Sequence, residues 1–297
     1  MPSSGPLSPQ AARVRPATLA RRATMSGVGL HSGKPVKLEV EPALPGTGLR
    51  FVRIDLPGEP EIPATVAAIR SSSFCTTLGD SAGAEVATVE HLLAALRGLG
   101  VTDAVLRVEG PEVPVGDGSA ACFADLLAEA GLAAQGGEAP YLELDHPVGV
   151  SRGEAVLVAL PAEEPQFTYV FTHPHPAVGV QLAEFVPDRD DFRTALAPAR
   201  TIGFLADIER MREQGLALGG SLECAVVIGD EGYVGPLRFP NEPARHKLLD
   251  LMGDLALIPP VRAHVLGLRS GHALNAELAR EILRAGRLRQ GGASQWR

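Results

Sequence analysis

Residues 241–254 carry the side chains best suited to holding a metal ion. His246 and Asp250 stand four residues apart, with Lys247 between them and Asp254 four residues further on. If the segment is a helix, residues at this spacing share one face with roughly 5–6 Å between their Cβ atoms. An imidazole and a carboxylate so placed supply two of the three protein ligands of a catalytic zinc site. The alternative is a solvated helix face that happens to carry one histidine and two acids.

The local sequence favours this helix. Asn241 can cap its start, Pro243 is tolerated in its first turn, and Pro259 and Pro260 stop it. An inward-facing apolar stripe is formed by Leu248, Leu249 and Met252.

A third ligand is offered far upstream, where residues 88–98 predict a second helix. Thr88 can cap this helix and the final glycine can end it, which would place Glu90 and His91 in an exposed first turn. The positive end of the helix dipole favours neutral His91, the form that binds metal. Because neighbouring side chains point in different directions, one of the pair can bind the ion while the other lies beside it. His91, His246 and Asp250 would leave one zinc position open for water, with Glu90 as the base.

His272 is the candidate acid. It follows a strand-like run at 263–268 and precedes a helical pattern, so it is presented at a strand-to-helix turn. A charged imidazole held by an acid such as Asp254 would suit proton donation to a leaving group. The alternative is a histidine that only caps a loop.

Two other motifs have structural explanations. The glycine-rich residues 27–34 have Val28 and Pro35 where a phosphate-binding Walker loop needs glycine and a hydroxyl, so we expect a turn between strands. His173 and His175 could form a metal pair, but ligands elsewhere are better placed, which favours a rigid loop around the proline between them.

Composition indicates a globular protein of about two domains. The 297 residues are 45% hydrophobic, enough for a sizeable core, and the net charge of −8 argues against nucleic acid binding. No apolar run reaches the ~18 residues that a membrane-spanning helix needs. The three scattered cysteines indicate reduced thiols in a cytoplasmic protein, neither a disulfide framework nor zinc ligands; they are Cys75, Cys122 and Cys224.

The chain divides at a glycine-rich segment. Residues 1–17 are rich in Pro, Ser, Ala and Arg and are predicted to be a disordered extension, either a bacterial extension, a misplaced start or an organellar targeting peptide. Residues 135–140 predict a linker between domain I (18–134) and domain II (141–297). Alternation predicts strands at 36–40, 49–54, 105–108 and 156–160, and residues 123–129 predict a helix.

Taken in order, these motifs resemble the zinc-dependent UDP-3-O-acyl-N-acetylglucosamine deacetylases. The resemblance runs from about residue 18 to 283 and includes residues 27–34. Its motifs are Thr-Val-Glu90-His91-Leu, Asp117-Gly-Ser-Ala, Ala199-Arg-Thr201, Leu218-Gly-Gly-Ser221, His246-Lys247-x-x-Asp250 and Ser270-Gly-His272-Ala-Leu-Asn275.

The resemblance implies an α+β fold of two similar two-layer α/β sandwich domains, packed face to face with the zinc site in the interdomain cleft. It implies removal of acetate from the 2-amide of UDP-3-O-(3-hydroxyacyl)-N-acetylglucosamine, a step of lipid A biosynthesis. We expect the protein to be a monomer. Two alternatives stay open: a zinc amidohydrolase acting on a different acylated amino sugar, and a catalytically silent homologue that binds sugar nucleotides.

The resemblance also implies a role for each catalytic residue. One Zn²⁺ would be bound by His91, His246 and Asp250, and Glu90 would activate the attacking water.

The remaining catalytic roles concern protons and charge. His272, steered by Asp254, would be the general acid, and the Thr201 hydroxyl would stabilise the oxyanion. Lys247 would contact the diphosphate of the substrate.

For the substrate, the resemblance implies that an insert at about 201–222 forms a hydrophobic passage for the acyl chain. Phe171 would stack on uracil. Ile202 and Leu222 stand where phenylalanines are expected, so aromatic packing there would be reduced. Each passage residue could instead be an ordinary core residue. The complete set of predicted substrate contacts is His31, Cys75, Phe171, Ile202, Phe204, Asp207, Ile208, Leu216, Leu218, Leu222 and Lys247.

Overall fold

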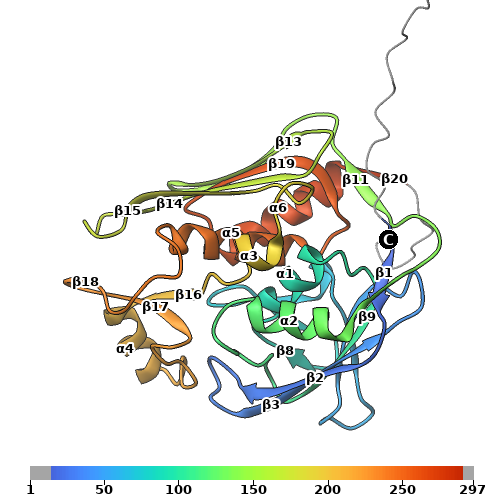
Figure 1. Ribbon diagram of the computed structural model, residues 1–297, viewed down its shortest axis with the longest axis horizontal. Helices are drawn as coiled ribbons and strands as arrows, with labels where there is room; N and C mark the ends of the chain where they lie inside the picture. Colours follow the sequence, from blue (N-terminus) through green and yellow to red (C-terminus); the bar gives the residue numbers. More distant parts are fainter. Residues whose placement is uncertain (1–14, 290–297) are drawn as a thin grey trace, which may run out of the picture.

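The structure is a computed structural model that describes residues 15–289. It is a mixed α+β fold in which helices lie between two main β-sheets (Figure 1). Residues 1–14 of the predicted N-terminal extension (1–17) lie outside the described residues, whereas residues 15–17 are described. Ala17 begins strand β1 and pairs with Ala134, so the extension was predicted too long at this end.

The N-terminal half, residues 15–134, is built on a five-stranded sheet of order β2-β3-β9-β4-β5. Its strands are β2 (Ala23–Val28), β3 (Pro35–Pro42), β9 (Ala104–Glu109), β4 (Leu49–Arg53) and β5 (Glu61–Pro63). Only the β4–β9 pair is parallel. Helices α1 (Glu90–Gly98) and α2 (Ala121–Ala130) cover the inner face of this sheet (Figure 1).

Shorter elements complete this half. Strand β1 (Ala17–Leu19) pairs with β10 (Leu132–Ala134), and β7 joins β6 and β8 in a small antiparallel sheet. The bounds are β6 (Ile69–Ser71), β7 (Thr77–Gly79), β8 (Glu85–Val86) and the 3₁₀ helix η1 (Val66–Ala68).

The C-terminal half, residues 141–289, is built on a seven-stranded sheet around β19, which pairs with β11, β13 and β14. The strands are β11 (Tyr141–Glu143), β12 (Val148–Arg152), β13 (Ala155–Pro161), β14 (Gln166–His173), β15 (Gly179–Phe185), β19 (Val261–Leu268) and β20 (Arg287–Arg289). Helices α5 (Glu242–Leu255) and α6 (His272–Ala285) cover its inner face (Figure 1).

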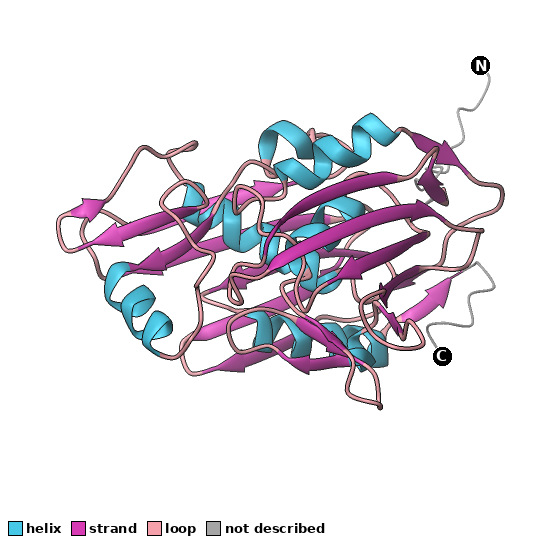
Figure 2. Ribbon diagram, turned by 90° about the horizontal axis from the view of Figure 1, so that it is seen from below, coloured by secondary structure: helices cyan, strands magenta, loops and turns pink. Residues whose placement is uncertain are grey.

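The predicted insert is a separate small unit. Strand β16 (Thr201–Phe204) leads into helix α4 (Leu205–Glu213) and pairs with β17 (Ala225–Gly229), which in turn pairs with β18 (Gly232–Tyr233). In both views α4 lies at one end of the molecule, apart from the four central helices (Figures 1 and 2). A short helix, α3 (Phe192–Ala195), precedes the insert.

The strands and helices predicted from hydrophobic periodicity are confirmed. Strand β19 alternates buried and half-buried residues along its whole length, with Val261, Ala263 and Val265 facing the helices. The predicted turn is confirmed for residues 29–34, which join β2 to β3, whereas residues 27 and 28 are the last two of β2.

The two halves meet through their helices. No strand pair within residues 15–289 links one half to the other. Instead α1 packs on α5, and one continuous hydrophobic core includes Leu92 of α1 and Leu249 of α5. The exact domain boundaries stay a prediction. The described helices include none that is both long and apolar enough to span a bilayer.

Candidate metal centre and catalytic site

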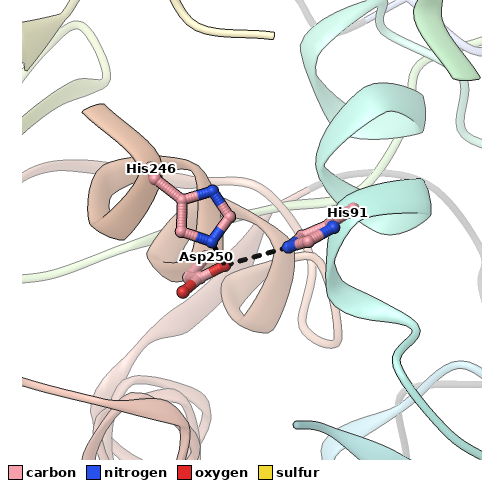
Figure 3. Close-up of side chains that lie close together, drawn as sticks. All are labelled: His91, His246 and Asp250. Carbon is pink, nitrogen blue, oxygen red and sulfur yellow. Dashed lines mark ion pairs between the residues drawn. The ribbon is translucent and has the colours of Figure 1, made fainter. Parts of the chain in front are cut away.

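His91, His246 and Asp250 converge at the contact between α1 and α5. Their possible ligand atoms all lie within 4.8 Å of one another, and all three side chains are buried. Figure 3 shows His91 pointing from α1 toward the two side chains of α5. Within residues 15–289 this is the one group of His, Cys, Asp and Glu side chains found in such an arrangement.

The orientation of these side chains fits a bound cation. His246 Nδ1 lies 3.1 Å from the carbonyl oxygen of Ala199, so it donates there and Nε2 carries a lone pair. That lone pair faces Asp250 Oδ1 at 3.3 Å, and His91 Nε2 faces the same oxygen at 3.4 Å. Asp250 Oδ1 is buried and has no hydrogen-bond partner. The His246 Nε2 lone pair and Asp250 Oδ1 are two acceptors that face one another in a buried place, so they need a positive charge between them, which a metal ion supplies.

The charge states of these groups agree with this interpretation. Burial lowers the pKa of His246 to about 3, despite the opposing effect of Asp250, so the ring is neutral. Burial alone would raise the pKa of Asp250, but His246 and Lys247 hold it well below the usual 3.8. A neutral imidazole and a carboxylate are the forms that bind metal.

A close approach between the two helices makes this convergence possible. A side chain at Gly253 of α5 would overlap the backbone carbonyl of Glu90 at the start of α1. Only glycine therefore lets α5 lie this close to the first turn of α1. His91 of one helix reaches His246 of the other, with ring centroids 5.0 Å apart.

A buried ion pair fixes the segment that orients His246. Glu242, in the first turn of α5, accepts hydrogen bonds from Arg200 N and Nε at 3.0 and 2.9 Å, and from Arg238 N at 2.6 Å. These bonds hold Arg200 against α5, so the neighbouring Ala199 carbonyl meets the His246 ring. The ion pair thus acts on the metal site through the backbone.

Glu90 lies beside the cluster as a buried carboxylate, 3% exposed. Its Oε2 accepts the backbone N–H of Thr76 at 3.1 Å, and its Oε1 lies 3.9 Å from His272 Nε2. Burial raises the pKa of Glu90, although His272 and His91 oppose the shift. A carboxylate whose pKa is raised accepts a proton more readily, as a general base must.

His272, the first residue of α6, is held by a carboxylate. Its Nδ1 lies 2.9 Å from Asp254 Oδ2, which also accepts a bond from Asn275 Nδ2 at 2.8 Å. Burial would lower the pKa of His272, but Asp254 and Glu90 raise it to about 9. The ring is therefore charged near neutral pH, with a proton on the Nε2 that points toward Glu90 and Asp250.

A cavity of about 670 Å³ opens onto these groups and continues along the insert. Its wall includes the three candidate metal ligands, Glu90, His272, Thr201 and Lys247. A larger cavity of about 910 Å³, lined by residues such as Arg97 and Tyr141, includes none of the candidate ligand or acid–base residues in its wall. The smaller cavity is therefore the candidate active site.

Six of the further predicted substrate residues line the smaller cavity; they are His31, Ile202, Phe204, Asp207, Ile208 and Leu222. The other four lie outside its wall. Leu218 is half exposed and lies against Gly33, and Leu216 follows α4. Cys75 is buried, and the nearby Glu90 carboxylate helps burial to raise the pKa of its thiol. Phe171 is in β14.

Three local predictions about the helix starts are wrong. Glu90 and His91 are buried by α5 and do not stand in an exposed first turn. Thr88 does not cap α1, because its hydroxyl donates to Glu112 Oε1 at 2.7 Å. Asn241 does occupy the N-cap position of α5, but its side chain bonds to Leu182 and Arg245 without capping the helix.

The two histidines of the 173–175 loop have structural partners. His173 stacks on Phe204 with ring centroids 4.0 Å apart, and His175 Nε2 lies 3.1 Å from the Asp230 carbonyl. The three cysteines are free.

Sequence reasoning missed the residues that support the site. Thr76 bonds to Glu90 and Asp254, and Glu112 binds the turn that carries His31. Thr76 stands in a run of serines and threonines with no periodic pattern. For Glu112, the one feature of the sequence that could have indicated a role was an acidic residue inside an apolar segment, Pro111 to Val115.

The chain matches known proteins over most of its length. Residues 16–284 match the family described as LpxC, UDP-3-O-acyl N-acetylglycosamine deacetylase. A protein of Thermosynechococcus vestitus named UDP-3-O-acyl-N-acetylglucosamine deacetylase is 47% identical over 268 residues, covering 89% of this chain and 93% of its own. Proteins of the same name from Geobacter sp. strain M21 (43% identical; 90% and 88% covered) and Chlamydia felis (42%; 90% and 96%) are also similar. A match of this extent and identity places the chain in the UDP-3-O-acyl N-acetylglycosamine deacetylase family.

Proposed function

We propose that this protein is a zinc-dependent deacetylase that hydrolyses the N-acetyl group of UDP-3-O-(3-hydroxyacyl)-N-acetylglucosamine and releases acetate, a step of lipid A biosynthesis. Family membership supports the reaction, and the convergence of His91, His246 and Asp250 supports metal dependence. The unpartnered, buried Asp250 Oδ1 between two imidazole nitrogens is the observation that carries the proposal.

Two imidazoles and one carboxylate suit zinc, which commonly takes three protein ligands in catalytic sites. When bound, the ion would polarise the amide carbonyl and make water more acidic. The side chains around it have the remaining tasks, because an amine is a poor leaving group and must receive a proton.

Glu90 is the proposed general base. Its carboxylate is buried on the cavity wall and its pKa is raised, so it can take a proton from the attacking water at Oε1. Thr76 N–H fixes the other oxygen of this carboxylate, which leaves Oε1 directed toward His272.

His272 is the proposed general acid. With its pKa raised to about 9, the ring carries the proton at Nε2 that the departing amine needs. Asp254 holds the Nδ1 side of the ring, which fixes the direction of Nε2. The positive ring would also stabilise negative charge on the carbonyl oxygen before it gives up its proton.

Thr201 and Lys247 complete the proposed polar contacts. The Thr201 hydroxyl is half-buried on the cavity wall and would donate to the developing oxyanion. Lys247 Nζ lies 2.7 Å from Asp250 Oδ2, and we assign it to the substrate's diphosphate. Burial would lower the pKa of Lys247, but Asp250 and Tyr169 raise it, so its positive charge is kept.

The insert is the proposed acyl passage. Ile202, Ile208 and Leu222 give its side of the cavity an apolar lining. We further propose a monomeric enzyme in the cytoplasm; the three free cysteines support the compartment, because reduced thiols are usual there.

The test is acetate release from the UDP-linked acylated substrate by purified protein, with and without a chelator. We expect turnover that the chelator stops and that added zinc restores. Release that is unaffected by complete metal removal would exclude a metal-dependent mechanism. A substrate without the fatty chain, measured in parallel, tests whether the passage contributes to recognition.

A further inference from the structure

Glu112 is a buried carboxylate whose bonds join three separate segments of the structure. It is 2% exposed and accepts the backbone N–H groups of His31 and Ser32, each at 3.0 Å, and the hydroxyl of Thr88 at 2.7 Å. Burying such a charge is costly unless donors surround it, so these bonds must hold the carboxylate and its donors firmly in place.

The turn between β2 and β3 is shaped around this carboxylate. Gly29 N donates to Lys34 O, Gly33 N donates to Gly29 O, and Gly33 has a φ of +62°. A methyl group at Gly29 would overlap Glu112 Oε2. The turn therefore wraps closely around one oxygen of Glu112 and presents His31 to the catalytic cavity.

The same turn touches the insert of the other half of the chain. Leu218 N donates to His31 O at 3.3 Å, and Gly219 N donates to Leu30 O at 3.0 Å. A side chain at Gly219 would overlap the carbonyl of Gly29. These two backbone bonds join Leu30 and His31, which line the cavity, to a segment that also lines it through Ala217, Gly220, Ser221 and Leu222.

We propose that Glu112 is a positioning residue that clamps the turn of residues 29–33 against the insert, and so fixes the wall that the acylated substrate contacts. This inference rests on the proposed function, because it assigns the wall to that substrate. Glu112 does not touch the reacting atoms. It acts on binding through His31 and Leu30, with little effect on the acid–base groups.

Two substitutions test whether Glu112 acts by holding the turn. In Glu112→Gln the side-chain carbonyl at the Oε1 position can still accept from Thr88 and from His31 N, but the amide NH₂ at the Oε2 position faces the N–H of Ser32, donor against donor. Gly29→Ala crowds the carboxylate and the Ser32 hydroxyl without altering the charge of Glu112. Glu109→Gln, an exposed glutamate three residues earlier, is the control for the first variant. Gly136→Ala, whose added methyl group meets nothing within 4 Å, is the control for the second.

Hydrogen exchange tests the clamp without any assay of activity. In both Glu112→Gln and Gly29→Ala, we expect the amides of Leu218 and Gly219 to exchange at least about tenfold faster, while amides inside α1 and α5 keep wild-type rates. Unchanged exchange at Leu218 and Gly219 would overturn the proposal. So would an equal increase throughout α1 and α5, because that indicates a general loss of stability.

Kinetics then test the assignment to substrate binding. Both variants should raise KM for the acylated substrate about tenfold with kcat within about threefold, and zinc content should stay at the wild-type level. Adding His31→Ala to Glu112→Gln should cost much less than the product of the single effects, because both act through one turn. A fall in kcat at unchanged KM, or fully multiplicative effects, would contradict the proposal. If wild-type protein releases no acetate, the proposed function fails, while the exchange result still decides whether Glu112 clamps the turn.

Discussion

Thr76 Oγ1 donates a hydrogen bond of 2.5 Å to Asp254 Oδ1, from one half of the chain to the other. The backbone N–H of the same residue donates to Glu90 Oε2. Thr76 is 1% exposed, so both bonds are shielded from water. One residue therefore holds the proposed base and the carboxylate that steers the proposed acid in a fixed relation.

Thr76→Val should lower kcat by roughly 10- to 100-fold, the usual cost of removing a partner of a residue at a metal site. Valine has nearly the shape of threonine but no hydroxyl, so Asp254 loses a donor while the N–H bond to Glu90 remains. Steady-state kinetics give kcat, and elemental analysis should find the wild-type zinc content. Thr77→Val, at the next position, should keep wild-type kcat; an equal loss in both variants would remove any special role for Thr76.

Glu90 and His246 should separate catalysis from metal binding. Glu90→Ala should retain zinc and lose roughly 10²- to 10⁴-fold in rate, since it removes a base that holds no metal. His246→Ala should lose the metal itself, because one of three ligands is gone. Metal content of the purified variants, measured together with circular dichroism to verify folding, decides the matter. Equal zinc content in the two variants would contradict the assignment of Glu90 as the base and His246 as a metal ligand.

Glu242→Gln should make stability less dependent on pH in the acid range. The burial of Glu242 would raise the pKa of its carboxyl, but Arg200 and two backbone donors lower it below the usual 4.5. A lowered folded-state pKa stabilises the protein above the unfolded-state pKa, and this contribution is lost as pH falls through the folded value.

The free energy of unfolding, measured by denaturant titration from pH 7 to 3.5, checks this. At pH 7 the variant should be less stable by about 3 kcal/mol, because Arg200 is left without its buried partner. The difference from wild type should shrink below about pH 4.5. Exposed Glu231→Gln serves as control and should follow wild type throughout. If the difference in unfolding free energy between variant and wild type stays constant down to pH 3.5, this network does not lower the pKa of Glu242.

Ile208→Trp should shift the acyl-chain preference toward shorter chains. Ile208 lines the cavity and lies against Gly203, so a larger side chain there has to occupy the passage. Exclusion of two methylene groups would raise KM for a long-chain substrate about tenfold. Comparison of KM for long-chain and short-chain substrates gives the result. An equal change for both would place the acyl chain elsewhere.

Local periodicity was enough to predict much of the fold. The four-residue spacing of His246 and Asp250, the apolar residues beside them and the prolines after them predicted α5, and alternation predicted strands such as β9. These signals succeed because a helix or strand must bury one face, whatever its partner is.

Features decided by distant packing could not be predicted in this way. Thr88 has good capping chemistry, but Glu112 lies 24 positions away in sequence and takes its hydroxyl, and the backbone at Thr88 has a φ of +57°. Glu90 and His91 are buried because α5 lies on them, and Gly253 is what permits that approach. In each case a tertiary contact overrides a local preference.

The most direct test of the metal centre is anomalous scattering at the zinc edge from crystals of the zinc-loaded protein. The account predicts a single strong peak within about 2.0–2.2 Å of His91 Nε2, His246 Nε2 and a carboxylate oxygen of Asp250. A zinc peak away from these three atoms, or no peak in crystals of active protein, would contradict it.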